Sequence, residues 1–113
     1  MVKRIYVPER GDVVWLDFNP TKGHEQSGRR PGLVVSPKIY NQKSRLALVC
    51  PITAMAKGYA FEVPVLCKNI KGVVLADHLR SVDWDARHVE FIGRVAQNVK
   101  NEVHEKLIRL IEL

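Results

Sequence analysis

The sequence has little of what marks secreted, metal-binding or membrane proteins. Among its 113 residues there are two cysteines, Cys50 and Cys67, without C-x-x-C spacing, and the four histidines are scattered, so no zinc signature is present. We expect both cysteines to be small core hydrophobes, the alternative being a disulfide or a catalytic thiol. No apolar run approaches the roughly 20 residues that span a bilayer. The N-terminal segment is charged and lacks the apolar stretch of a signal peptide. We therefore expect a cytoplasmic protein with no membrane anchor, metal or cofactor.

Acidic residues are also scarce. There are 12 Asp and Glu residues against 18 Lys and Arg residues, which gives a net charge of +6. A basic excess of this size suits a polyanionic partner such as a nucleic acid. A membrane surface is the competing partner, but it would require a basic amphipathic helix. The sequence contains no segment of that kind, so the charge favours a nucleic acid without establishing one.

Linkers, internal repeats and low-complexity tracts are absent as well, and we expect a single domain over residues 1–113. The segment 12–18 alternates apolar and polar residues, as expected of a strand with one buried face. Further apolar stretches with turn residues between them predict five more strands, at residues 32–36, 45–53, 61–65, 72–79 and 89–95. Pro37 can open a turn or short helix after the second strand, and Pro64 suggests that the fourth strand lies at a sheet edge.

The period changes near the C-terminus. Five apolar residues fall on one helical face: Val99, Val103, Leu107, Leu110 and Ile111. Asn98 is a suitable N-cap for this helix. The pattern as a whole predicts a mainly β protein, a small and strongly bent antiparallel sheet or barrel with a terminal helix packed on it.

The segment GHEQSGRRP, residues 23–31, lies between apolar runs and is dense in groups able to move protons or bind anions. It sits with further blocks along the chain: RGDVVWLDFNPTKGHEQSGRRPGLVVSPKIYN, CPIT, KGYAFEV and GVVLADHLRSVDW. These blocks, in this order and at nearly constant spacing, resemble the MazF/PemK family of toxin endoribonucleases, closer to MazF than to PemK. The resemblance covers Pro8 to about Leu113.

The resemblance implies an SH3-like β-barrel with a C-terminal helix, a fold shared with the gyrase poison CcdB. It also implies a homodimer that cleaves single-stranded RNA without metal, and a MazE-like antitoxin that covers the RNA groove. Metal-free cleavage uses the 2′-hydroxyl of the substrate as the nucleophile and leaves a 2′,3′-cyclic phosphate and a 5′-hydroxyl end. The enzyme must then supply a base, an acid and positive charge for the phosphorane.

Two residues match positions that the family treats as catalytic. Arg30, the Arg of the Arg-Pro pair, can fork two phosphate oxygens, and Pro31 restricts it toward extended backbone. Thr53 ends the third predicted strand, and its hydroxyl can donate one hydrogen bond to the phosphorane. The plainer interpretations are a solvated loop arginine and a strand-end cap.

Glu25 and His24 are the candidates for proton transfer. The alternative for Glu25 is pairing with an arginine that orients the loop. Residues expected to contact the RNA are Gln26, Arg29, Lys57, Asp77, His78, Arg80 and Arg87. A PemK-type Asp/Arg pair would need arginine at position 75, where this chain has Leu75, and that moves weight to Arg30 with Thr53. Trp84 lies in a predicted loop, where an exposed ring could serve RNA, the antitoxin or the dimer.

Two other functions remain open at this point. A CcdB-like toxin would bind and poison a protein target without catalysis, and fold similarity cannot separate it from a nuclease. A plain basic RNA-binding domain would bind RNA without turnover. Arg30 and Thr53 together with the Glu25 loop favour an endoribonuclease.

Overall fold

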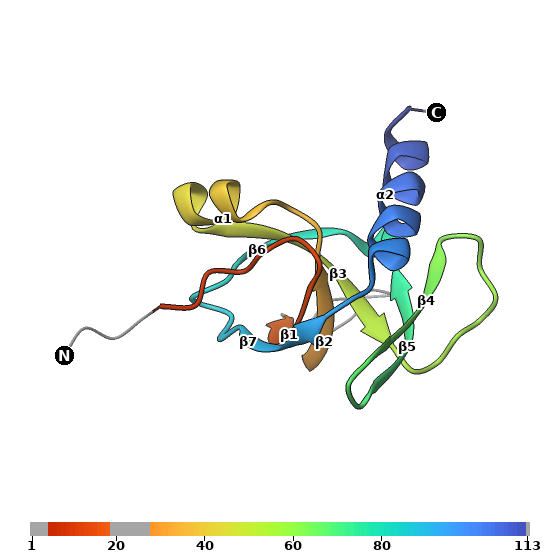
Figure 1. The fold of residues 1–113 in the computed structure, drawn as a ribbon, viewed down its shortest axis with the longest axis horizontal. Helices are drawn as coiled ribbons and strands as arrows, with labels where there is room; N and C mark the ends of the chain where they lie inside the picture. Colours follow the sequence, from red (N-terminus) through yellow and green to blue (C-terminus); the bar gives the residue numbers. More distant parts are fainter. Residues whose placement is uncertain (1–4, 19–27, 113) are drawn as a thin grey trace.

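The computed structural model describes residues 5–18 and 28–112. In chain order the elements are β1 (Asp12–Phe18), β2 (Gly28–Val34), α1 (Lys38–Ser44), β3 (Leu46–Thr53), β4 (Glu62–Cys67), β5 (Ile70–Leu75), the 3-10 helix η1 (Ala76–His78), β6 (Arg80–Asp83), β7 (Glu90–Arg94) and α2 (Gln97–Glu112). The described strands form one antiparallel sheet in the order β4-β5-β3-β2-β1-β7, and β6 pairs with β3 off this path (Figure 1).

Strand β3 makes the sheet curl because it changes partner along its length. Its first half, Leu46 to Val49, pairs with β6, whereas Ile52 and Thr53 pair with β5. Pro51, which has no N–H to donate, lies between these two stretches. The chain passes from β5 to β6 through η1, which turns the corner between the two partners. The result is a half-closed barrel, with α1 near one end and the β4–β5 hairpin near the other (Figure 1).

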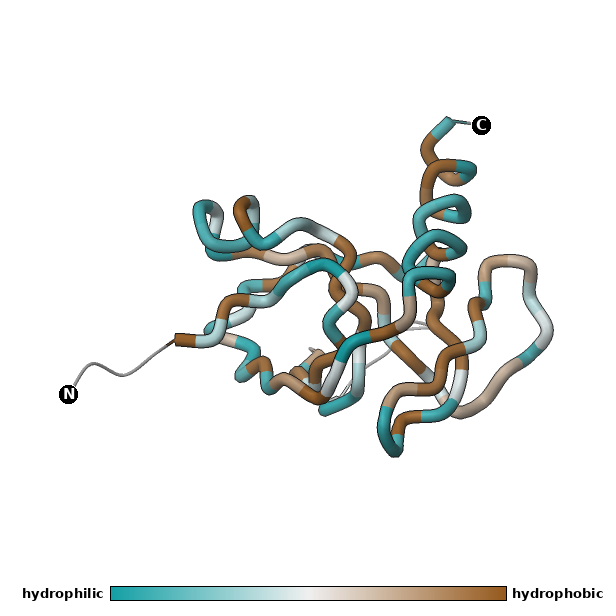
Figure 2. Tube along the Cα trace, viewed as in Figure 1, coloured by the Kyte–Doolittle hydropathy of each residue, from teal (hydrophilic) through white to brown (hydrophobic). Residues whose placement is uncertain are grey.

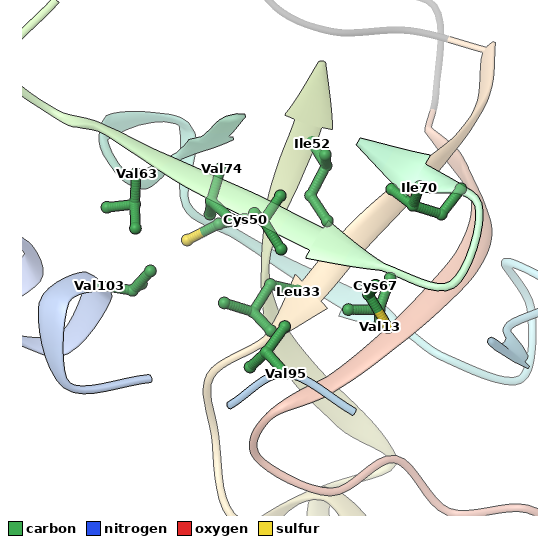
Figure 3. Close-up of a cluster of buried hydrophobic side chains, with 11 residues drawn as sticks. Val13, Leu33, Cys50, Ile52, Val63, Cys67, Ile70, Val74, Val95 and Val103 are labelled. Atoms are coloured by element: carbon green, nitrogen blue, oxygen red, sulfur yellow. The ribbon is translucent and has the colours of Figure 1, made fainter. Parts of the chain in front are cut away.

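The central strands β1, β2 and β3 carry a hydrophobic core on each face. One core contains residues of these strands together with the β4–β5 hairpin and α2, among them Val13, Leu33, Cys50, Ile52, Val63, Val74 and Val103, which point toward one another in Figure 3. The other core contains alternate residues of the same strands with β6 and the loop that follows it: Val14, Leu16, Phe18, Val34, Ala47, Val49, Val82 and Trp84. Figure 2 shows that hydrophobic residues are frequent in the central strands, which lie between these two cores.

Helix α2 packs through only part of its apolar face. Val103 is buried, and Val99 and Leu107 pack against the first core. The helix then extends past the sheet (Figure 1), so Leu110 is 39% exposed and Ile111 75% exposed. One end of the predicted apolar stripe is therefore left on the surface of the chain.

The fold class is confirmed: the protein is mainly β, with a curled antiparallel sheet and a C-terminal helix. The short helix after Pro37 and the edge position of β4 with its Pro64 are also as expected. Both cysteines are free and buried, as expected of small core hydrophobes.

Several boundaries were wrong. The strand predicted over 72–79 ends at Leu75, and residues 76–78 form η1. Strand β6 was missed because it is only four residues long and lies in a polar segment. Helix α2 begins at Gln97, so Asn98 is inside it and is not its N-cap. The second strand begins at Gly28 and not at Gly32, which puts Arg30 in the sheet ladder.

Candidate functional site

Arg30 lies on β2, directly opposite Leu16 of β1. Residues that pair directly across an antiparallel ladder share one face of the sheet. Leu16 is fully buried in the core that contains Trp84, whereas Arg30 is exposed. Arg30 therefore lies at the solvent-exposed edge of that core. Pro31, paired with Trp15, restricts the backbone of Arg30, the residue that precedes it.

Thr53 closes β3 on the same face of the sheet. Gly32 pairs with Pro51, and side chains alternate along each strand, so Arg30 and Thr53 each lie two residues further on that face. Continuing the register by two residues would set Arg30 opposite Thr53. The Thr53 hydroxyl accepts a hydrogen bond from the backbone N–H of Met55 at 3.2 Å. That bond uses the oxygen as acceptor, so the hydroxyl proton remains able to donate.

Two glycines permit the close packing behind these residues. A Cβ on Gly32 would lie 2.6 Å from Cγ1 of Val49, and one on Gly72 would lie 2.1 Å from the carbonyl oxygen of Thr53. Real Cβ atoms do not approach that closely, so both positions require glycine. The backbone of Thr53 is thus held firmly against β5.

Arg80 joins the same face from β6, because it pairs with Val49. Its guanidinium carbon lies 5.4 Å from the centre of the Phe18 ring on β1. A cation over an aromatic face is attracted by the ring quadrupole. Since Phe18 is two residues from Leu16 along β1, Arg80 reaches toward the strand ends where Arg30 lies. We call Arg30, Thr53 and Arg80 the strand-end cluster.

Lys57 lies in the loop that follows Thr53. The Glu62 carboxylate accepts hydrogen bonds from the backbone N–H groups of Lys57 and Gly58, each at 3.0 Å. The loop is also tied to α2, because the Lys106 ammonium donates to the carbonyl oxygen of Ala60. Lys57 is exposed, and Gly58 has the positive φ, 81°, expected from the sequence.

Asp77 and His78 lie on η1, which leads into β6 and Arg80. The closest nitrogen and oxygen of their side chains are 3.9 Å apart, too far for a hydrogen bond. Both side chains are partly exposed, at 42% for Asp77 and 27% for His78. In the chain they come immediately before Leu79 and Arg80.

Arg29 is on the opposite face of β2 from Arg30. Its guanidinium donates to Asp17 at 2.9 Å, to Glu90 at 2.6 Å and to the carbonyl oxygen of His88 at 3.1 Å. Asp17 also contacts Nδ1 of His88 at 3.0 Å. Hydrogen bonds from His88 and then from Arg29 lower the pKa of Asp17 below its usual 3.8. We call Asp17, Arg29, His88 and Glu90 the rear network.

Arg87 adjoins the rear network through the backbone. It donates from Nη1 to the carbonyl oxygen of Asp17 at 3.4 Å, and its own carbonyl oxygen accepts from the N–H of Asp17 at 3.0 Å. The expected RNA contacts of Arg29 and Arg87 remain predictions, and for Arg29 the carboxylates are competing partners. His24, Glu25 and Gln26 lie outside the described residues.

The interpretation of Trp84 as an exposed ring was wrong. The ring is 4% exposed and its N–H donates to the carbonyl oxygen of Asn41 at 2.9 Å. The loop-like sequence around it hid a buried anchor. Sequence reasoning also missed the carboxylates of Asp17, Glu62 and Glu90, because their partners are distant in the chain and no spacing rule connects them.

Metal ligands do not gather in the part of the chain that the structure describes: no group of three or more His, Cys, Asp or Glu side chains is placed to hold an ion there. None of the described helices is long and apolar enough to cross a membrane. Fold and site together define a small curled-sheet protein that presents cationic side chains and a hydroxyl at one end of its strands. Such an arrangement is suited to binding a phosphodiester.

Comparison with known proteins identifies relatives that act on RNA, in agreement with a site suited to a phosphodiester. A family model described as PemK-like, MazF-like toxin of type II toxin-antitoxin system matches residues 9–111. The endoribonuclease toxin MazF of Escherichia coli K12 is 45% identical over 111 residues, covering 98% of this chain and 99% of that protein. The endoribonuclease EndoA of Bacillus subtilis is 32% identical over 114 residues, covering 89% of this chain and 91% of that protein. A crystal structure of MazF from Deinococcus radiodurans superposes with a TM-score of 0.90 at 48% identity, covering 96% of this chain and 100% of that one.

The chain therefore belongs to the PemK/MazF family of toxins of type II toxin-antitoxin systems. The resemblance seen in the sequence is confirmed, and the protein is an endoribonuclease toxin of this family. The CcdB-like alternative is not favoured.

Proposed function

We propose that the protein is a sequence-specific endoribonuclease that cleaves single-stranded messenger RNA without metal and so stops translation and growth. The observation that carries the proposal is the placement of Arg30, Thr53 and Arg80 on one face of the sheet: Arg30 near the start of β2, Thr53 at the end of β3 and Arg80 at the start of β6. The net charge of +6 supports a polyanionic substrate.

In the proposed reaction the ribose 2′-oxygen attacks the adjacent phosphorus and the 5′-oxygen leaves. Negative charge builds on the two non-bridging oxygens as the phosphorane forms. Arg30 forks these oxygens, because a guanidinium keeps its charge at any working pH and presents parallel N–H groups. The Thr53 hydroxyl donates one further hydrogen bond, a kind of contact worth about 2–4 kcal/mol in comparable sites.

Proton transfer is assigned to Glu25 and His24, in the segment that precedes β2. Glu25 removes the 2′-proton or shares that work with His24, and the second group protonates the leaving oxygen. These two assignments rest on residue chemistry and on the resemblance alone.

The remaining candidates bind the RNA along its path. Lys57 and Arg80 contact phosphates, with Arg29 and Arg87 as further cations. His78, Asp77 and Gln26 contact base edges. Exposed Tyr59, 64% accessible in the loop that Glu62 holds, offers a ring on which an unpaired base can stack.

Residues 1–113 form a single toxin domain that acts as a homodimer in the cytoplasm. The exposed Leu110 and Ile111 of α2 supply apolar surface for a second copy. Crystal structures of MazE-MazF from Deinococcus radiodurans, one 46% identical to this chain at a TM-score of 0.85, support a MazE-like antitoxin as partner. Its inhibitory segment should be acidic and apolar, and should displace RNA from the basic groove.

The test is incubation of the purified protein with a long RNA in EDTA, with Arg30→Ala alongside. We expect fragments ending in 2′,3′-cyclic phosphate and 5′-hydroxyl groups, and none from the variant. Intact RNA with the native protein would favour a binding function. Cutting by Arg30→Ala at the native rate would show that the roles assigned here are wrong.

A further inference from the structure

The rear network spans three neighbouring strands. In the sheet β1 lies between β2 and β7. Arg29 starts on β2, contacts Asp17 on β1 and reaches Glu90 on β7, at 2.9 Å and 2.6 Å. One guanidinium therefore crosses the middle strand and fastens both of its neighbours to it.

The network stands where the backbone ladder stops. The β1–β7 pairing ends at Trp15 and Glu90, so Asp17 extends beyond the ladder on that side. There the N–H of Asp17 bonds to the carbonyl oxygen of Arg87, and its carboxylate contacts His88. Side-chain contacts thus continue the attachment of β1 past the last paired residue.

His88 is held in an uncommon backbone conformation. Its φ is +53°, in the left-handed region that residues with a Cβ avoid. Such a conformation persists when surrounding contacts enforce it. Here its carbonyl oxygen accepts from Arg29 and its ring contacts Asp17, so the same network that bridges the strands also holds this turn.

The pairing register of β1 and β2 places the rear network next to Arg30, the proposed catalytic residue. Asp17 is opposite Arg29, and the adjacent pair is Leu16 opposite Arg30. Arg29 and Arg30 are neighbours whose side chains leave β2 on opposite faces. Whatever fixes the backbone of Arg29 therefore fixes the direction from which the Arg30 side chain departs. The rear network therefore acts on the residue next to Arg30, from the opposite face of the sheet.

We propose that Asp17 is a positioning residue of the ribonuclease: through Arg29 and His88 it locks the start of β2, so that Arg30 is held in the orientation that the transition state requires. It touches no substrate itself. The inference rests on the proposed function of Arg30. It predicts that loss of the Asp17 charge lowers kcat and leaves KM nearly unchanged, because ground-state binding by other cations persists.

The experiment compares Asp17→Asn with a matched control, Asp85→Asn. Asp85 forms a more exposed ion pair with Arg45, the residue that follows α1, at 3.4 Å, and is not one of the four residues of the rear network. Both variants lose one carboxylate charge from the surface. Steady-state cleavage of a short single-stranded RNA over a range of RNA concentrations gives kcat and KM for each variant and for the native protein. Hydrogen exchange of the amides of residues 28–30 is measured for the same three proteins.

We expect Asp17→Asn to lower kcat at least about 10-fold with KM within about 2-fold of native, and to speed exchange of the amides of residues 28–30. Asp85→Asn should change neither, and Asp17→Glu should recover part of kcat. Native kcat with faster exchange, or equal losses in both aspartate variants, would overturn the positioning role. Absence of cleavage by the native protein would instead overturn the proposed function, and the exchange data would still report whether Asp17 holds β2.

Discussion

The same face of the sheet ends in two different ways. Near α1 it is closed: Trp84 is buried, and the Asn41 side chain beneath it, also fully buried, donates to the carbonyl oxygens of Pro8 and Ser36 at 2.8 Å and 3.1 Å. At the far ends of β2 and β3 the face is open and carries Arg30 and Thr53. The closed end has its polar groups satisfied within the chain, and the described residues leave no buried side-chain polar atom unpartnered.

The contrast follows from what covers each end. Strand β6 pairs beside the first half of β3, and Val82 and Trp84 add to the core on this face. The second half of β3 pairs with β5 instead, and Arg30 on this face is exposed. Burial at the closed end provides stability, because deleting buried aromatic rings is costly. The polar donors Arg30 and Thr53 at the open end are those that we propose to act on the RNA phosphate. We expect substitutions at the two ends to separate activity from stability.

The largest effect is expected at the open end. Arg30→Ala should lower the cleavage rate at least about 10³-fold, because it removes the charge that neutralises the phosphorane. Its melting temperature should stay within about 2 °C of native, since the side chain is exposed. A quenched time course of RNA cleavage measures the rate, and thermal unfolding measures the melting temperature. Unfolding of the variant at a much lower temperature would mean that Arg30 is structural.

The reverse pattern is expected at the closed end. Trp84→Ala should cost about 3–5 kcal/mol of unfolding free energy, because the ring is packed in the core and its N–H bond to Asn41 is lost. Denaturant titration measures the loss. The rate per folded molecule, measured below the unfolding transition, should equal the native rate. A selective fall in RNA affinity would instead restore the interpretation of Trp84 as a base-stacking ring.

Thr53→Val keeps the shape of the side chain and removes the hydroxyl. We expect about a 10²-fold loss of kcat, since one donor to the phosphorane is absent. Stability should change little, because the bond from the N–H of Met55 lies at the exposed end of the strand. Serine at this position is the control and should retain most of the rate. Equal rates for the valine and serine variants would show that the hydroxyl is only a strand-end cap.

The smallest effect concerns pH. Burial raises the pKa of the Cys50 thiol from 9.0 to about 12, so the folded state holds this proton more tightly than the unfolded state. Stability from this group is fully present below pH 9 and falls as the pH rises from 9 toward 12. Cys50→Ala should flatten that part of the stability curve. Rapid alkylation of Cys50 in the native protein at pH 8 would show that the thiol is not buried.

Sequence analysis predicted the features that depend on local patterns of residues. The alternation over Asp12–Phe18 and the apolar period of the last helix predicted β1 and α2, and the family motifs pointed to Arg30 and Thr53. It failed where tertiary contacts decide. Strand β6 exists because β3 offers a partner, and Trp84 is buried because Asn41, 43 residues away in the chain, accepts its N–H. The bridge from Arg29 to Glu90 joins residues 61 apart, a relation that no spacing rule contains.

The central claim is that the open end of the sheet stabilises attack by the substrate's own ribose oxygen. The most direct measurement places a single 2′-deoxy nucleotide at the mapped cleavage site of an otherwise unmodified RNA. We predict that cleavage at that site disappears in EDTA while the oligonucleotide still binds and competes with unmodified RNA. Cleavage of the 2′-deoxy site at the rate of unmodified RNA would contradict the account.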